Sequence, residues 1–313
     1  MPTAFHHEAF LYADADEFLA STLPFIRSGI EAGEPALVAV SRPRAEALRG
    51  ELGDDRDRVH FVDMEALGRN PARIIPFWRQ FVDEHGGRDR PLRGIGEPVW
   101  PGRRPAEVDE CQRHESLLNY AFWDGPAWRL LCPYDSAGLD DDVLAAAHQS
   151  HFCVSGSAAN RDEAAGEDLD PLSCRPFAGS LPSRPAGTAM LAFDRAGLHD
   201  ARALVAAEAE RAGLSADRVF DLVAAVGELT ANSVMHGGGC GRLGVWREAE
   251  TVLVEVEDAG EIVGSLTGRI RPAVMQQGGR GVWMANQLCD LVQIRSGAKG
   301  TKVRLRMELT DRA

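Results

Sequence analysis

The sequence predicts two domains of different fold class: an α/β domain built on a parallel sheet, followed by an α+β sandwich. In the first half, short apolar runs alternate with amphipathic stretches, an order typical of a parallel sheet covered on both faces. In the second half, two helical stretches are followed by several strands, which indicates an antiparallel sheet with helices on one face. The 313 residues are enough for two such domains.

The boundary between the domains is predicted in a segment rich in small residues and proline. Residues 155–187 read SGSAANRDEAAGEDLDPLSCRPFAGSLPSRPAG and keep no hydrophobic period, which is typical of a linker. We therefore expect a first domain at 1–154, a linker at 155–187 and a second domain at 188–313.

In the first half, the elements alternate between strand and helix. The apolar runs predict strands at 9–13, 36–40, 59–62, 92–95 and 128–132, with helices near 15–31, 43–52, 71–85, 105–122 and 140–150. Folds of this kind often bind nucleotides, yet no GxxxxGK[ST] or GxGxxG follows any of these strands. The segment GIGEPVW (94–100) follows a strand but lacks the lysine and hydroxyl residue of a phosphate loop. The first half thus has the pattern of a nucleotide-binding fold without its phosphate loop.

In the second half, helices come before most of the strands. The patterns predict helices at 195–212 and 216–236, another helix opening within 278–290, and strands at 188–193, 241–248, 251–258, 291–296 and 301–309. The run TVLVEVED (251–258) places valine at every second position, so one face of this strand is expected on the core.

Composition excludes several classes of protein. The formal net charge of −13 disfavours nucleic-acid binding, which needs clustered lysine and arginine. The sequence contains no run of about 18 apolar residues, so no membrane span is predicted. The start, MPTAFHHEAF, lacks the basic and apolar regions of a secretory signal, so we expect a cytoplasmic protein. The cysteines form no CxxC pair, and we interpret them as reduced thiols, with disulfides or metal ligands as the alternatives; they are Cys111, Cys132, Cys153, Cys174, Cys240 and Cys289.

The stretch GELTANSVMHGG (227–238) carries three polar side chains on one helix stripe. Glu228, Asn232 and His236 follow one another at four-residue steps, so they share a face. Asn232 offers a neutral oxygen of the kind that Mg²⁺ accepts. Glu228 could take a proton from an attacking hydroxyl. Alone, the stripe also fits a solvated helix face, and His236-Gly237 also fits an ordinary helix end.

Three glycine-containing motifs follow this helix: EVEDAG (255–260), GGRGVWMAN (278–286) and GAKGT (297–301). Asp258 could accept the adenine amino hydrogens, and Gly260 would let the ring approach the backbone. Gly279 and Gly281 would free backbone N–H groups at a helix start to face phosphate. Each motif alone is typical of a turn, but their order behind the 216–236 helix predicts a Mg-ATP site.

The motifs GELTANSVMHGG, EDAG, GGRGVWMANQLCD and GAKGTKVRLRM resemble the conserved boxes of the GHKL ATPases, and most closely the anti-sigma-factor serine kinases among the histidine-kinase-like ATPases. The resemblance covers about 188–313. It implies that Glu228 is the catalytic base and that Asn232 is the Mg²⁺ ligand. The ATP-binding positions that it implies are Asn232, His236, Asp258, Gly260, Gly279, Arg280, Gly281 and Thr301.

The chain departs from that family pattern at its first glycine box. The usual DxGxG reads DAGEI here, with Ile262 at the second glycine position, and the segment up to Gly278 is short, which indicates a reduced ATP lid. A non-catalytic module that binds a sigma factor or its antagonist therefore stays open as the alternative.

The first half resembles the MEDS sensory domain through HHEAFLYADADEF, GRNPARIIPFW, GIGEPVW, HESLLNYAF and LLCPYD. That domain is similar to RecA-like ATPases without the phosphate loop, and the resemblance implies sensing without naming a ligand. We expect a small-molecule pocket formed by Glu97, Trp100, His114 and Glu115. The alternatives are ordinary structural hydrogen bonding and a metal site drawn from five histidines and three carboxylates: His6, His7, His114, His148 and His151, with Glu8, Glu97 and Glu115.

Together the two halves resemble actinobacterial anti-sigma regulators of the stress-response type. The resemblance implies a protein that binds ATP and Mg²⁺, controls a sigma factor and phosphorylates a serine of an anti-sigma antagonist, under the control of the sensory domain. A sensor histidine kinase is disfavoured, because residues 155–187 contain no histidine to accept phosphate. Relatives of the ATPase half commonly pair, so a homodimer stays open.

Overall fold

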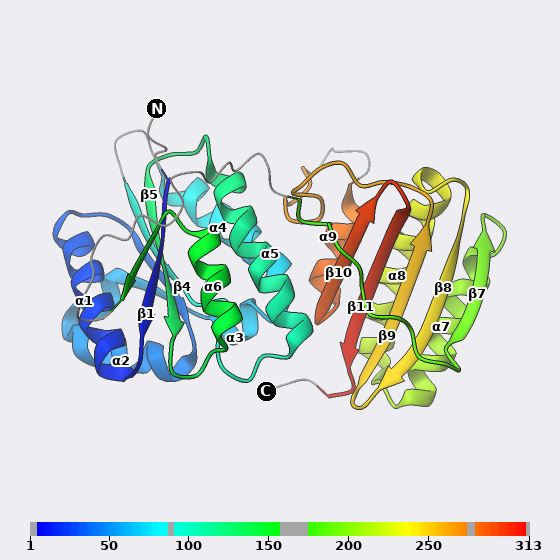
Figure 1. The fold of residues 1–313 in the computed structure, drawn as a ribbon, viewed down its shortest axis with the longest axis horizontal. Coiled ribbons are helices and arrows are strands. Elements are labelled where there is room, and N and C mark those ends of the chain that lie inside the picture. Colours follow the sequence, from blue (N-terminus) through cyan, green and yellow to red (C-terminus); the bar gives the residue numbers. More distant parts are fainter. Residues whose placement is uncertain (1–4, 87–90, 157–174, 274–278, 311–313) are drawn as a thin grey trace. The chain divides into compact units, whose positions relative to one another are not determined.

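The computed structural model describes residues 5–86, 91–156, 175–273 and 279–310. The chain forms two compact units, Met1–Cys174 and Arg175–Ala313 (Figure 1). Within the described residues, no helix is both long and apolar enough to cross a lipid bilayer.

The first unit contains a six-stranded parallel sheet with strand order β3-β2-β4-β5-β1-β6. Its strands are β1 Phe5–Tyr12, β2 Ala36–Val40, β3 Val59–Asp63, β4 Leu92–Gly96, β5 Trp128–Asp135 and β6 Cys153–Gly156. Its helices are α1 Ala15–Glu31, α2 Arg42–Leu52, α3 Met64–Leu67, α4 Ile74–His85, α5 Pro105–Phe122 and α6 Asp141–Ser150, with 3₁₀ turns η1 Gly53–Arg58 and η2 Pro71–Arg73. The predicted α/β class is confirmed.

Helices lie on both faces of this sheet (Figure 1). On one face, apolar side chains of α1 and α2 pack on Phe10 of β1, Val38 of β2 and Leu131 of β5. Neighbouring residues of a strand point to opposite faces, so His7 and Cys132 lie on the other face, which α5 and α6 cover.

Two strands of the first unit differ from the expected ones in ways that bear on the site. Strand β1 begins at Phe5 instead of residue 9, which brings His7 into the sheet. Strand β6 was not expected, and it pairs with β1 at the sheet edge. Its last two residues, Ser155 and Gly156, belong to the segment that the sequence assigns to a linker.

The second unit contains a five-stranded antiparallel sheet with strand order β10-β11-β9-β8-β7. The strands are β7 Ala189–Asp194, β8 Cys240–Glu248, β9 Thr251–Asp258, β10 Leu291–Gly297 and β11 Gly300–Glu308, and the helices are α7 Leu198–Ala212, α8 Ala216–His236 and α9 Arg280–Leu288. Valines of β9 pack with Leu222, Val226 and Leu229 of α8 in the core, so the predicted α+β class is confirmed.

The other face of this sheet is covered by the segment that precedes β7, drawn in green across the strands in Figure 1. Phe177 of this segment is buried in the core of the unit. The Arg184 guanidinium pairs with Glu255, and the Pro182 carbonyl accepts a hydrogen bond of 2.6 Å from Arg304. The last part of the expected linker therefore packs as part of the second unit.

Candidate functional site

Helix α8 presents the polar stripe at the edge of the core. Its N-cap is Ser215 and its C-cap is Gly237, whose N–H donates to the Ser233 carbonyl. Leu229 is buried, whereas Glu228 and Asn232 are half-buried and His236 is exposed. The stripe is thus not a solvated face along its whole length, because its first two members lie against other elements.

A pocket of about 270 Å³ lies where the C-terminal half of α8 meets β9, β11 and the start of α9. Six of the predicted ATP-binding residues line it: Asn232, His236, Asp258, Gly260, Gly279 and Thr301. These six residues converge on one cavity although Asn232 and Thr301 are 69 positions apart in the sequence. The volume lies just below the range of about 300–1,000 Å³ that is usual for small-molecule sites.

Asp258, the last residue of β9, is held by two hydrogen bonds. Its Oδ2 accepts from the Ser233 hydroxyl at 2.6 Å, and its Oδ1 accepts from the Gly260 N–H at 2.8 Å. A carboxylate has about four lone-pair sites, so this one keeps acceptor capacity toward the pocket. A Cβ at Gly237 would lie 2.6 Å from Asp258 Oδ1, which explains the glycine after the helix.

The turn after Asp258 is fixed by a short chain of hydrogen bonds. The Thr301 hydroxyl donates to the Gly260 carbonyl at 2.8 Å and lies 2.6 Å from the Ser296 hydroxyl. The Ser296 oxygen in turn accepts from the Ile262 N–H at 2.8 Å. Ile262 lines the pocket and packs against the core, so the second glycine position of the box here contributes an apolar wall.

Helix α9 begins beside the stripe of α8. Its N-cap, Gly279, has φ of +76°, a left-handed conformation that favours glycine. A Cβ at Gly281 would lie 2.6 Å from Asn232 Nδ2 and 3.2 Å from Glu228 Oε2. Within the described residues, Glu228, Arg280 and Gly281 do not line the pocket itself, and the Arg280 guanidinium donates to the Ala273 carbonyl at 3.4 Å.

The four residues expected to form a sensory pocket belong to different polar groups. Glu97 is buried at the end of β4, where it accepts from the Tyr12 hydroxyl at 2.9 Å and pairs with Arg44. The Trp100 ring lies under the Arg103 guanidinium, 3.6 Å from its centre. Glu115 takes part in another cluster, described next, and His114 is buried beside it on α5.

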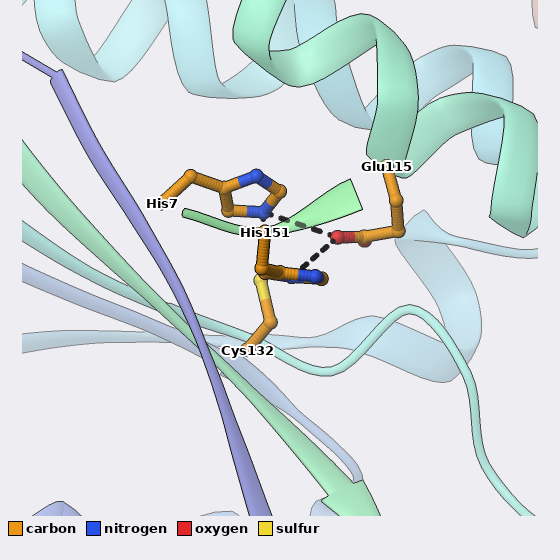
Figure 2. Close-up of side chains that lie close together, drawn as sticks. All are labelled: His7, Glu115, Cys132 and His151. Atoms are coloured by element: carbon orange, nitrogen blue, oxygen red, sulfur yellow. Dashed lines mark hydrogen bonds and ion pairs between the residues drawn. The ribbon is translucent and has the colours of Figure 1, made fainter. Parts of the chain in front are cut away.

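That cluster consists of His7, Glu115, Cys132 and His151, whose donor atoms all lie within 4.8 Å of one another (Figure 2). Glu115 Oε2 lies 3.1 Å from His7 Nε2 and 3.0 Å from His151 Nε2. His7 Nε2 is also 3.3 Å from Cys132 Sγ. Strand β1, strand β5, helix α5 and the C-cap of α6 each supply one member, and every one of these residues is at most 1% exposed.

The comparisons with known proteins assign each half. Residues 6–152 match the family model described as MEDS, MEthanogen/methylotroph, DcmR Sensory domain. Residues 191–307 match the model of the histidine kinase-like ATPase domain. The chain joins a MEDS domain to a histidine kinase-like ATPase domain.

Comparison with complete proteins adds less. No curated protein matches the chain. Among solved structures, the chain is similar to the RsbU and RsbW domains of Rv1364c from Mycobacterium tuberculosis, with 21% identity over 41% of this chain and 34% of that one, and a TM-score of 0.32. The chain thus spans about a third of that protein.

Burial and mutual contact set the ionisation of the MEDS cluster. Burial alone raises the pKa of Glu115, but the two imidazoles outweigh it and hold that pKa well below its ordinary value. Burial and the neighbouring His151 lower the pKa of His7. Burial and the Glu115 charge raise the pKa of the Cys132 thiol well above its ordinary value.

Sequence reasoning missed three parts of these sites. Ser233 and Ser296 hold the Asp258 turn of the ATPase domain. Ser233 stands inside GELTANSVMHGG and Ser296 directly precedes GAKGT, but no role was predicted for either residue. Cys132 was interpreted as a reduced thiol, with a metal ligand among the alternatives, and was not placed beside the histidines. The alternative metal site grouped His151 with His148, but His151 lies beyond the last residue of α6 and is buried, whereas His148 is exposed.

Proposed function

We propose that this protein binds Mg-ATP in its histidine kinase-like ATPase domain and uses it to control a sigma factor by phosphorylating a serine of an anti-sigma antagonist. The observation that carries the proposal is the convergence of Asn232, Asp258, Gly260, Gly279 and Thr301 on one pocket. The resemblance of these motifs to the anti-sigma-factor serine kinases supports the choice of substrate class.

The residues of the pocket fit the nucleotide. Asp258 is anchored by Ser233 and Gly260 and keeps acceptor capacity for an exocyclic amine. The α-carbons of Gly237 and Gly260 pack so closely against neighbouring groups that a Cβ at either position would collide with them. The pocket walls are otherwise apolar at Leu229 and Val303, as expected for a site that accepts a planar base.

Each residue has a defined task in this proposal. Asn232 would hold Mg²⁺ through its side-chain oxygen, and Gly279 would open α9 toward phosphate. Glu228 would accept the proton of the serine hydroxyl as the new oxygen–phosphorus bond forms and ADP leaves. Glu228 lies one turn before Asn232, beside the Gly281 backbone, so base and metal ligand share one helix face.

The first test is calorimetric titration of the full chain with a non-hydrolysable ATP analogue, with and without Mg²⁺. We expect binding that depends on Mg²⁺ and that Asn232→Ala weakens at least about tenfold. Glu210→Ala, an exposed change on α7, serves as the control and should leave binding unchanged. Nucleotide binding that is absent at millimolar concentration, or that ignores Asn232, would contradict the proposal.

The second test follows transfer of labelled γ-phosphate to a candidate antagonist. Glu228→Ala should abolish transfer while leaving analogue binding near that of the wild-type chain. The label should be stable to acid and lost in base, as for phosphoserine. Undiminished transfer by Glu228→Ala would remove Glu228 from its role.

Ile262 favours a second function, a non-catalytic docking module for the sigma factor or its antagonist. Its side chain stands in the pocket where the family pattern has glycine. In that case partner affinity would be equal with and without Mg-ATP. We further propose that the MEDS domain controls the activity of the ATPase domain in response to a small-molecule signal. A homodimer is compatible with either function.

A further inference from the structure

The MEDS domain contains a second candidate site that is independent of ATP binding. Its four members come from segments distant in sequence, at positions 7, 115, 132 and 151, and all are buried. Buried polar groups normally satisfy one another through hydrogen bonds. In this cluster His7 and Cys132 have hydrogen-bond partners, whereas among the described residues the Glu115 carboxylate oxygens and His151 Nε2 have none.

The two histidines have fixed orientations. The Nδ1 of His7 lies 3.0 Å from the Asn119 side-chain oxygen, and the Nδ1 of His151 lies 2.8 Å from the Ala147 carbonyl oxygen. Both partners are acceptors only at these atoms, so each Nδ1 carries the ring hydrogen. Each Nε2 is then an unprotonated donor of an electron pair in the neutral ring. Hydrogen bonds of this kind are the usual support for histidines that bind metal.

Both Nε2 atoms point at the Glu115 carboxylate, which is itself rich in electron pairs (Figure 2). Among the described residues, both carboxylate oxygens and His151 Nε2 have no hydrogen-bond partner, although Nε2 and Oε2 are only 3.0 Å apart. Electron pairs that face each other at this distance need a positive centre between them. That centre is either a set of protons on the rings or a metal ion.

We propose that His7, Glu115, Cys132 and His151 bind one divalent transition-metal ion, of which Zn²⁺ fits best. Two imidazole nitrogens, one sulfur and one carboxylate oxygen form a donor set that zinc accepts, whereas Mg²⁺ and Ca²⁺ take oxygen donors. Zinc bonds of about 2.0–2.3 Å place the donors of one tetrahedral ion roughly 3.3–3.8 Å apart. The four donor atoms already lie within 4.8 Å of one another, so the side chains must shift to close on one ion, but no element has to move far.

Charge balance favours the same ion. Binding a dication expels the thiol proton of Cys132, and the resulting thiolate and the Glu115 carboxylate together neutralise the ion. A neutral centre is what a fully buried position demands, since an unpaired charge there is costly. The ion would join β1, β5, α5 and the end of α6, and its burial predicts slow exchange with solvent.

The test uses the full chain, purified under reducing conditions without chelator. Its metal content is measured by mass spectrometry. We expect one equivalent of zinc per chain. The chain refolded with Co²⁺ should show a thiolate-to-cobalt charge-transfer band and the intense visible bands of tetrahedral cobalt. Wild-type chain without bound metal, and without these bands after refolding with Co²⁺, would overturn the proposal even if every variant fails to fold.

Variants locate the site. Cys132→Ser should abolish the charge-transfer band and lower zinc affinity by more than the 10- to 100-fold typical of outer-shell changes. Cys111→Ser is the matched control, because Cys111 is also fully buried in the same unit but donates to the Pro98 carbonyl. Metal content and bands that persist in both Cys132→Ser and His151→Ala would place the ion elsewhere and overturn the assignment.

Discussion

The MEDS cluster and the ATPase pocket differ in how far their polar groups are closed off. In the ATPase domain, Asn232 is half-buried and His236 is exposed, and the functional groups face a cavity. In the MEDS domain, His7, Cys132 and His151 are at most 1% exposed and face one another. The first arrangement suits a ligand that is exchanged in each cycle, and the second suits one that is acquired on folding and then retained.

A second difference concerns the partners of buried carboxylates. Glu255 of the ATPase domain is 2% exposed and faces two guanidinium groups, those of Arg304 and Arg184. Glu115 of the MEDS domain is equally buried but faces two imidazoles. An arginine always carries its charge, whereas an imidazole is a cation only when protonated. The negative charge of Glu255 is therefore balanced by arginines of the protein itself, whereas Glu115 is suited to bind a metal ion.

The largest expected effect comes from removing that ion. Chelation during partial unfolding should destabilise the MEDS domain by several kcal/mol, since structural zinc contributes on the order of 10 kcal/mol in small zinc domains. ATP should act on the other domain only, and at 100 times its Kd it should add about 2.7 kcal/mol. Hydrogen exchange read separately in the two domains measures both effects. If a chelator lowered the stability of both domains equally, the proposed difference between a metal-binding MEDS domain and a nucleotide-binding ATPase domain would be wrong.

Arg304→Ala should give the next largest effect. Arg304 and Glu255 are each 2% exposed at the side chain, and the Nε donates to Oε2 at 2.8 Å. Removing Arg304 takes one of two guanidinium groups from the buried Glu255 and leaves only Arg184, so we expect a part of the about 3–5 kcal/mol that breaking a buried ion pair costs in the free energy of unfolding. Denaturant titration measures this cost.

Its control is Arg211→Ala in the same domain, where the exposed Arg211 pairs with the half-buried Glu208. That change should leave the denaturation midpoint unaltered. If Arg304→Ala also left the denaturation midpoint unaltered, water would reach the sheet face under residues 175–187, and the charges on that face would not be buried.

Gly237→Ala should weaken nucleotide binding at least about tenfold, with a smaller loss of stability. The new Cβ would lie 2.6 Å from Asp258 Oδ1, so the carboxylate must move from its place in the pocket. Gly227→Ala on the same helix is the matched control: its Cβ would lie 3.5 Å from Arg202 Cδ, an ordinary contact. Replacing a helical glycine should stabilise α8 by up to about 1 kcal/mol. If both variants bound nucleotide with equal affinity, the position of the Asp258 carboxylate would not matter for nucleotide binding.

The fold classes could be predicted because they depend on local periodicity. Alternating apolar runs gave the parallel sheet, and the valines of 251–258 gave the core face of β9. The other face of β9 was less predictable, since Glu255 and Glu257 look solvent-facing in sequence. Their burial depends on Arg184, more than 70 positions earlier, in a segment that composition marks as a linker.

The two candidate sites differed in how far sequence could predict them. Motif order predicted that Asn232, Asp258 and Thr301 lie together, and all three line one pocket, because each motif stands near the end of a regular element. The MEDS cluster has no such order. His7 precedes the strand start expected at residue 9, and Cys132 and His151 meet it only through the pairing of β1 with β5 and the turn after α6.

The smallest expected effect is a pH dependence of the ATPase domain through Glu257. Burial alone would raise the pKa of Glu257, but Lys302, Arg184 and Arg242 outweigh it and hold the pKa below its ordinary value of 4.5. A depressed carboxylate pKa adds stability that is fully present above pH 4.5 and is lost as the pH falls through the lower, folded value. Glu257→Gln cannot lose it, so the stability gap between wild type and variant should narrow as the pH falls below 4.5. Denaturant titrations at a series of pH values measure the gap, with exposed Glu210→Gln as a control that should show no such change. A gap that stays constant with pH would mean that the pKa of Glu257 is the same in the folded and unfolded states, so that the three cations add no net electrostatic stabilisation to this carboxylate.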